Sequence, residues 1–296
     1  MRTLIFASSL LLLAPPAMAA ATRVGTLTEP AIPEASGLAP SRAHPGLYWV
    51  ENDSGNPPDA FLIDPQGRRR MTLHVDGVPN IDWEDAASFD LRGRHYLLLA
   101  DAGDNGAKRE TVALHVVEEP ARIADAHARP AWSIRFRWPG GPRDCEAVAV
   151  DARAGIVLLV SKRTVPAQLY SLPLRPRARG VLVAKFLGDV AGIPQPTRTE
   201  RIETPFFGKY LAQVTAASLA PDRRNLAILT YRSIYLYRRR GAEGWAQAVS
   251  RPPLPLAFGW LPQAEALAFG LDGRALFVTG EHLPAAIVRV DVPPTP

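Results

Sequence analysis

Two short acidic segments carry the residues best suited to chemistry. Asp82, Glu84 and Asp85 fall within four residues, and Asp101 and Asp104 follow after a strongly apolar run. Grouped carboxylates are the ligands that hard cations such as Ca²⁺ prefer, because these ions bind oxygen. A single acidic loop is common on protein surfaces, so its meaning depends on whether the arrangement recurs along the chain.

The acidic segments belong to a repeat. Five segments align, and each is followed by a turn, an apolar strand and a third strand. They are "EASGLAPS" (34–41), "DWEDAASF" (82–89), "DCEAVAVD" (144–151), "TAASLAPD" (215–222) and "QAEALAFG" (263–270). Fourth strands are expected at 71–75, 132–138, 181–187 and, interrupted by prolines, near 249–256. Short apolar runs bounded by Gly, Pro, Asp and Asn are typical of strands.

This repeat predicts an all-β chain that folds as a single β-propeller over residues 21–296, with five four-stranded blades. The last repeat has only three strands. Residues 23–29 are therefore expected to supply its fourth strand, which would close the ring by pairing the two ends of the chain. Two repeat spacings exceed the ~40–50 residues of ordinary propeller repeats. A sixth, degenerate blade between 188 and 213 is the alternative.

A propeller would bring the acidic segments together. The first strand of each blade lines the central channel and the second runs back beside it, so first-strand starts and second-strand ends share one mouth. The aligned positions are Ser36, Glu84, Glu146, Ala217 and Glu265 in first strands, and Asn52 or Asp53, Asp101, Lys162, Arg232 and Glu281 in second strands. We therefore predict an axial ligand-binding mouth formed by Asp53, Asp101, Lys162, Arg232, Glu281 and His282.

The same mouth is a candidate metal site. Carboxylates about 7 Å apart repel by roughly 2 kcal/mol per pair, so a compensating charge is expected. Three explanations stay open: salt bridges to Lys162 and Arg232, a bound cation such as Ca²⁺, or a shared proton. The aspartates at turns, Asp85 among them, could instead only cap backbone amides. The candidate metal ligands are Asp82, Glu84, Asp104, Glu146 and Glu265.

The first 20 residues are typical of a secretory signal peptide. Arg2 precedes the apolar run 4–13, and small residues place the cleavage site near Ala19. We expect the mature protein to be exported, and to be periplasmic or secreted. Cys145 is the single cysteine, so an intrachain disulfide is excluded, which favours a bacterial periplasm.

Composition narrows the expected partners. The net charge is +5, but the arginine clusters are scattered and no aromatic residues interleave with them, so a nucleic-acid partner is not expected. Outside the signal peptide, no apolar stretch approaches the roughly 18 residues of a membrane span. We expect a monomer whose partner is a small polar ligand or another envelope protein.

The motifs "SGLA", "NDSG", "DWED", "DAGDN", "DCEA" and "AEALAF", in this order, resemble a group of secreted bacterial β-propellers that is loosely similar to propellers labelled phytase-like or esterase-like. The resemblance covers nearly the whole mature chain and implies the fold and export. It places Asp82, Glu84, Asp101, Asp104, Glu146 and Glu265 at the channel mouth. The chain departs from the pattern at 216–218, where Ala-Ala-Ser stands in place of Gly-Ala-Asp.

Three functional hypotheses follow. The first is an exported propeller that binds a cation or a small polar or anionic ligand at its acid-rich mouth. The second is a Ca²⁺-dependent hydrolase of phosphate or carboxylate esters, in which Lys162 and Arg232 would clamp the anion. The third is a protein-interaction scaffold. The chain has no G-x-S-x-G, H-E-x-x-H or P-loop motif, so it carries no sequence signature of a nucleophile or base.

Overall fold

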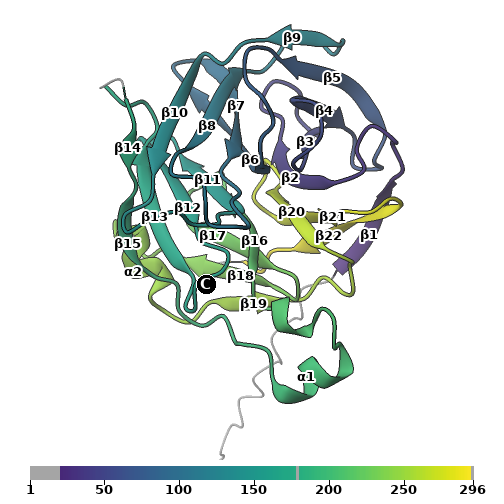
Figure 1. Ribbon diagram of the computed structural model, residues 1–296. Helices are drawn as coiled ribbons and strands as arrows, with labels where there is room; N and C mark the ends of the chain where they lie inside the picture. Colours follow the sequence, from purple (N-terminus) through teal and green to yellow (C-terminus); the bar gives the residue numbers. More distant parts are fainter. Residues whose placement is uncertain (1–20, 178–179, 295–296) are drawn as a thin grey trace, which may run out of the picture.

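In the computed structural model, residues 21–177 and 180–294 are described, and their strands form five sheets arranged in a ring (Figure 1). Each sheet is one blade, with its first strand on the central channel. The prediction of an all-β, five-bladed propeller is confirmed. A sixth blade is wrong, because residues 188–213 contain only the end of one strand and two short helices.

The strand bounds follow the aligned repeat. Blade 1 contains β2 (Ala35–Pro40), β3 (Tyr48–Asn52), β4 (Asp59–Ile63) and β5 (Arg69–Val75). Blade 2 contains β6 (Trp83–Leu91), β7 (Arg94–Asp101), β8 (Val112–Glu118) and β10 (Trp132–Arg137). Blade 3 contains β11 (Ala147–Asp151), β12 (Ile156–Val160), β13 (Gln168–Pro173) and β15 (Lys185–Asp189). Blade 4 contains β16 (Val214–Leu219), β17 (Asn225–Thr230), β18 (Ile234–Arg238) and β19 (Leu254–Leu256).

Blade 5 joins the two ends of the described chain. It contains β20 (Ala264–Phe269), β21 (Ala275–Gly280), β22 (Ala285–Asp291) and β1 (Ala21–Leu27). Strands β1 and β22 pair antiparallel, from Ala21 opposite Val290 to Leu27 opposite Ala285. The predicted closure of the ring by the terminal strands is therefore confirmed. The expected signal peptide, 1–20, lies outside the described residues.

The outer edge of each of the first three blades is covered by a segment of the next blade. Strand β9 (Ala126–Ala128) adds in parallel to β5, and β14 (Leu182–Val183) adds in parallel to β10. Helix α2 (Trp245–Val249) packs against β15. Two sheets thus have five strands where four were expected, and the run 181–187 divides into β14 and β15. Covered edges cannot pair with another chain, which protects the fold from aggregation.

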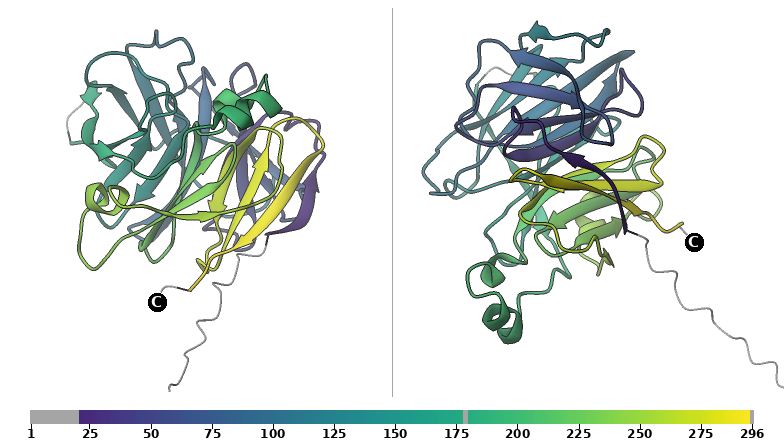
Figure 2. Two further views of the ribbon diagram at one scale, coloured as in Figure 1. Left: turned by 90° about the horizontal axis from the view of Figure 1, so that it is seen from below. Right: turned by 90° about the vertical axis from the view of Figure 1, so that its right-hand side faces the viewer.

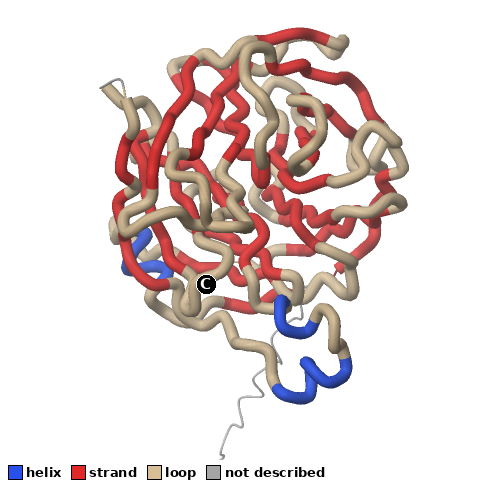
Figure 3. The backbone as a smooth tube through the Cα atoms, in the orientation of Figure 1, coloured by secondary structure: helices blue, strands red, loops and turns tan. Residues whose placement is uncertain are grey.

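The hydrophobic core lies between neighbouring blades. One cluster, for example, joins Leu98 and Leu114 of blade 2 to Val148 and Leu159 of blade 3. Both faces of an inner strand are buried in this way. Figure 3 shows the strands arranged in the ring that brings neighbouring blades face to face. This explains why the runs 96–100 and 156–160 are continuously apolar and do not alternate with polar residues.

A helical insertion stands on one face of the ring. Helix α1 (Arg198–Glu203) and the 3₁₀ helix Gly208–Tyr210 lie between blades 3 and 4, and they project on the side away from the C-terminal end of the described chain (Figure 2). Thr197 and Glu200 form a capping box that starts α1. Within residues 21–177 and 180–294, no helix has the length and apolar character needed to cross a membrane.

Gly25 in β1 should be essential for the closure of the ring. The turn 64–68 of blade 1 covers β1, and Thr26 N donates to Gln66 O at 3.2 Å. A Cβ at position 25 would lie 2.3 Å from the Pro65 carbonyl oxygen. We expect Gly25→Ala to lower the free energy of unfolding by about 1–3 kcal/mol in urea denaturation, because backbone must shift.

The matched control for this variant is Gly244→Ala, whose added Cβ would meet no atom within 4 Å at a φ of −78°. It should change the free energy of unfolding by no more than about 0.5 kcal/mol. Equal stability of the two variants would show that the contact between β1 and the turn 64–68 is not close.

Candidate metal centre at the acidic mouth

The first strands of four blades begin with a β-bulge, which leaves one residue unpaired. The bulged residues are Ser36, Glu84, Thr215 and Glu265, and Glu146 directly precedes the first strand of blade 3. A bulge re-aims the side chain that it carries, and here it occurs where each strand leaves the channel mouth. The predicted alignment is thereby corrected in blade 4, because Thr215 and not Ala217 occupies the position of the glutamates.

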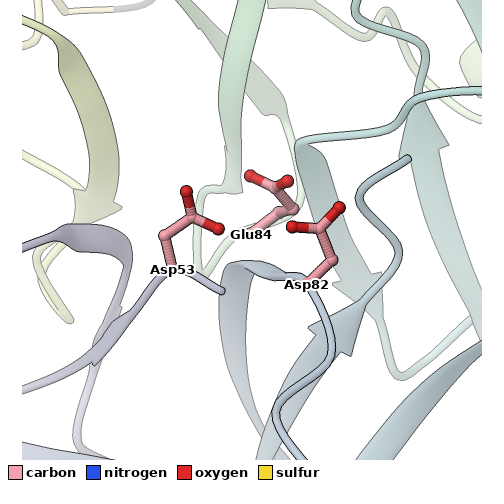
Figure 4. Close-up of side chains that lie close together, drawn as sticks. All are labelled: Asp53, Asp82 and Glu84. Carbon is pink, nitrogen blue, oxygen red and sulfur yellow. The ribbon is translucent and has the colours of Figure 1, made fainter. Parts of the chain in front are cut away.

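Three carboxylates form the first candidate cation site. Asp53 follows β3, Asp82 precedes β6 and Glu84 lies in the bulge, and each offers an oxygen within 4.8 Å of the others. Figure 4 shows the three side chains converging from these two blades. Among the described residues, Oε1 of Glu84 is buried without a hydrogen-bond partner. The three carboxylates, hereafter the first triad, therefore contain an oxygen that still lacks a positive partner.

Gly103 makes this close approach possible. A Cβ at position 103 would lie 2.0 Å from Oε1 of Glu84 and 2.6 Å from Oδ2 of Asp82. The backbone N–H of Gly103 also donates to the carbonyl of Asp82 at 3.1 Å. The glycine in "DAGDN" thus leaves the space in which the two carboxylates meet.

A second triad shares Glu84 and adds Asp144 and Glu146. Two of its carboxylates are already paired with cationic side chains. Nζ of Lys162 donates to Oε1 of Glu146, and Nε of Arg163 contacts Oδ2 of Asp144 at 2.6 Å. Burial alone would lower the pKa of Lys162, but Glu146, Glu265 and Glu84 together raise it, so the ammonium stays charged. In the second triad, salt bridges to Lys162 and Arg163 therefore compensate the charges of Glu146 and Asp144.

Glu265 and Glu281 form a third part of the mouth. The hydroxyl of Tyr231 donates to Oε1 of Glu265 at 2.5 Å, and Nε2 of Gln263 donates to Oε2 of Glu281 at 2.5 Å. Burial, a hydrogen bond with Glu265 and the charge of that residue raise the pKa of Glu281 to about 10. A raised pKa at Glu281 is the direction that the hypothesis of a shared proton predicts.

The carboxyls of the first triad hold their protons to higher pH than free carboxyls do when no cation is present. Burial, followed by the charge of Asp53, raises the pKa of Asp82 to about 6. Burial, and then the charge of Glu146, raises the pKa of Glu84 well above its usual range. Burial likewise raises the pKa of Asp53. Either protons or a cation must therefore neutralise this end of the channel.

Four predicted site residues belong to neither triad nor to the pair Glu265 and Glu281: Arg232, His282, Asp101 and Asp104. The guanidinium of Arg232 binds Glu200 of α1 at 2.6 Å and the carbonyl of Pro194 at 2.6 Å, so the predicted pairing of Arg232 with the glutamates is wrong. His282 has an exposed side chain, and only its backbone N–H, bonded to Pro33, is fixed.

Asp101 and Asp104 shape the loop that follows β7. Asp101 accepts from Nη2 of Arg109 at 2.7 Å, and Asp104 accepts from the backbone N–H groups of Lys108 and Arg109 at 2.8 Å. Asp101 also accepts from the backbone N–H of Asp82 at 3.2 Å, so it holds the start of β6 as well as its own loop. The contacts of Asp104 agree with the alternative that turn aspartates cap backbone amides. They support the triads by fixing the position of Gly103.

Sequence reasoning missed two buried acids, Asp144 and Glu51. Asp144 stands where Asp82 stands in the aligned segment, so the repeat itself contains the signal. Glu51 interrupts the apolar run of β3, and burial together with Asp53 and Asp85 raises its pKa.

Asp85 binds backbone amides, as the alternative interpretation of the aspartates proposed, but these amides lie in three blades and not in one turn. Its carboxylate accepts from the N–H groups of Ala86 at 2.8 Å, Val148 at 2.7 Å and Ala217 at 3.1 Å. These amides belong to the first strands of blades 2, 3 and 4. Asp85 therefore ties three blades together below the mouth, and burial raises its pKa although the three amide bonds act in the opposite direction.

The chain shows no significant match to a protein-family model or to a curated protein.

Proposed function

We propose that this protein is an exported β-propeller that binds one Ca²⁺ ion through Asp53, Asp82 and Glu84. The observation that carries the proposal is the buried Oε1 of Glu84, which has no partner among the described residues and lies within 4.8 Å of two further carboxylates. A buried charge without a partner is costly, and a bound cation removes that cost.

The neighbouring cations favour the first triad over the second as the binding site. Lys162 and Arg163 neutralise the second triad. The charge of Arg109 lowers the pKa of Asp82, but the guanidinium of Arg109 is ion-paired with Asp101 at 2.7 Å and not with Asp82. Among the described residues, no side chain of the first triad forms an ion pair, so this triad is the part of the mouth that a cation would neutralise.

The chemistry of the donors favours Ca²⁺. All three are carboxylate oxygens on loops and a bulge, and Ca²⁺ accepts irregular sets of six to eight oxygens, whereas Mg²⁺ requires near-ideal octahedral geometry. Asp53 and Asp82 are only half-buried, so water can complete the coordination shell and the ion can enter from solvent.

A Ca²⁺-dependent hydrolase of phosphate or carboxylate esters is the second candidate. A hollow of about 80 Å³ lies beside the second triad and is lined by Lys162, Arg163 and Lys209. An anionic group seated there would meet Lys162 and Arg163, which pair with Glu146 and Asp144 of the second triad, and a hydrolase would require the ion to reach and polarise that group. This arrangement differs from the predicted clamp, because Arg232 is bound to Glu200.

Export is part of the same proposal. Strand β1 begins at Ala21, so cleavage near Ala19 would leave the closing strand intact. Millimolar Ca²⁺ is typical of extracellular modules, and a site of three carboxylates is expected in the weak range of about 10⁻⁴–10⁻³ M. The resemblance to secreted propellers remains a prediction that agrees with this location.

A calcium titration tests the proposal. Protein treated with chelator and then freed of it should bind one Ca²⁺ in isothermal titration calorimetry, and Mg²⁺ should bind more weakly. Phosphate and carboxylate ester substrates assayed with and without Ca²⁺ would then separate the binder from the hydrolase. Absence of Ca²⁺ binding at 10 mM would overturn both candidates, because both depend on the ion.

A further inference from the structure

The opposite end of the channel has the reverse charge. Every inner hairpin, the turn between the first and second strands of a blade, contains an arginine. These are Arg42, Arg92, Arg153, Arg223 and Arg274. Because all five turns lie at the end of the propeller opposite the starts of the first strands, the repeat places a ring of arginines on the face away from the acidic mouth. The repeat thus specifies two charged faces.

A cavity of about 310 Å³ opens at this end. Four of the ring arginines line it, together with a single acid, Asp90. Its walls are mostly small and apolar, as at Ala39, Ala87, Ala220 and Phe269. The volume is in the range of about 300–1,000 Å³ that is usual for small-molecule sites.

Asp85 separates the cavity from the acidic mouth. The next residue, Ala86, and Ala217, whose N–H it accepts, both line the cavity. The buried carboxylate with its three amide bonds therefore forms a partition across the channel. A ligand in the arginine-lined cavity would occupy a site distinct from the proposed Ca²⁺ site.

Two of the four arginines are available for a ligand. Arg223 is held by Asp151, with contacts of 2.6 and 3.1 Å, and Arg42 approaches Asp90 at 3.6 Å. Arg92 and Arg153 are exposed, and neither side chain has a hydrogen-bond or ion-pair partner among the described residues. With Asp151 paired to Arg223 and Asp90 close to Arg42, the other two guanidinium groups, those of Arg92 and Arg153, leave an excess of two positive charges at the cavity.

We propose that the arginine-lined cavity binds a small organic anion whose apolar body enters the cavity while its carboxylate or phosphate head meets Arg92 and Arg153. The guanidinium fork matches either head group by paired N–H···O bonds. The apolar walls favour an anion that carries a hydrocarbon body over a fully hydrated inorganic ion. The partition at Asp85 keeps the ligand out of reach of the acidic mouth.

Calorimetry with octanoate, at 150 mM salt and in EDTA to keep the acidic mouth free of metal, tests this site. The wild type should bind octanoate, and Arg92→Gln with Arg153→Gln should weaken binding at least about tenfold, because two charge-assisted hydrogen bonds are lost. The melting temperature should not change, since neither arginine has a protein partner.

The matched control replaces Arg122 and Arg129, two exposed arginines outside the cavity, with glutamine. It should leave octanoate affinity unchanged. Inorganic phosphate should bind more weakly than octanoate, whereas an alkyl phosphate of similar length should bind comparably. No binding of octanoate, equal loss in both double variants, or phosphate binding as tight as octanoate would each overturn the proposal.

Discussion

Replacing Asp85 with alanine should lower the free energy of unfolding by about 3–5 kcal/mol, measured by chemical denaturation, because three buried amides lose their acceptor. These are the N–H groups of Ala86, Val148 and Ala217, in three different blades. The loss acts on the innermost strands, where the blades meet around the channel.

The strand itself should accept alanine at this position. The corresponding residues next to the mouth in the other blades are small, namely Gly37, Ala147, Ala216 and Ala266. Steric fit therefore does not explain the expected loss. Asp90→Ala is the matched control, because Asp90 lies on the same strand with its side chain 55 % exposed. It should cost less than about 1 kcal/mol. Similar costs for the two variants would contradict the role of Asp85 as a tie between blades.

Replacing Glu84 with glutamine should raise the melting temperature in EDTA and abolish the response to Ca²⁺. In the absence of metal, Glu84 must either take up a proton or face Glu146 and Asp53 as a buried carboxylate; the neutral glutamine avoids both costs, and its amide can donate to a neighbouring carboxylate. With Ca²⁺, the variant lacks the ligand that both triads share. We expect at least about a hundredfold loss of Ca²⁺ affinity, equivalent to about 2.7 kcal/mol.

Glu110→Gln is the control for the same change of charge. Glu110 is exposed in the loop after β7, on the same face, and belongs to neither triad. It should keep the Ca²⁺ response and the melting temperature of the wild type. A Glu84→Gln protein that is destabilised in EDTA would indicate that Glu84 is held in an internal ion pair, and would contradict the unpartnered oxygen on which the site depends.

Most of the blade pattern could be predicted from the sequence because it is local. Each first strand, turn and second strand forms one continuous segment, and the unpaired third strand of the last repeat predicted the closure by β1. The metal candidates Glu84 and Glu146 were found because the repeat places them at the same register. The added strands β9 and β14 could not be predicted, because they form by contact with segments that are distant in the sequence. Strands β9 and β14 have only three and two residues and no periodicity of their own.

The errors at the mouth have the same physical origin. The alignment of blade 4 with blade 1 places the Leu-Ala-Pro at 219–221 opposite the Leu-Ala-Pro at 38–40. In the structure, Leu38 lies two residues after the bulge of its strand and Leu219 lies four residues after its own, so this alignment is displaced by two residues. The partner of Arg232 lies in the helical insertion, whose six-residue α1 is too short to show a helical period. The reach of Asp85 across three blades becomes visible only when the ring is closed.

The acidic mouth also predicts an unusual dependence of stability on pH. The pKa of Asp82 is raised to about 6 and that of Glu281 to about 10 by burial and neighbouring acids, so the folded protein holds these protons to higher pH than the unfolded chain does. Stability from such groups is complete below the unfolded pKa values and is lost as pH rises through the folded ones. The stabilising carboxyls with lowered pKa, such as Glu200 at about 2, titrate well below pH 5.

The most direct test of the Ca²⁺ site is therefore the melting temperature of the wild type at pH 5 and pH 8, each in EDTA and in 10 mM Ca²⁺. In EDTA, the protein should melt at a lower temperature at pH 8 than at pH 5. Ca²⁺ should raise the pH 8 value by about 5 °C, as expected for an ion at 100 times its Kd, and should have a smaller effect at pH 5, where protons compete. A melting temperature at pH 8 that is the same in EDTA and in Ca²⁺ would contradict the proposed Ca²⁺ site.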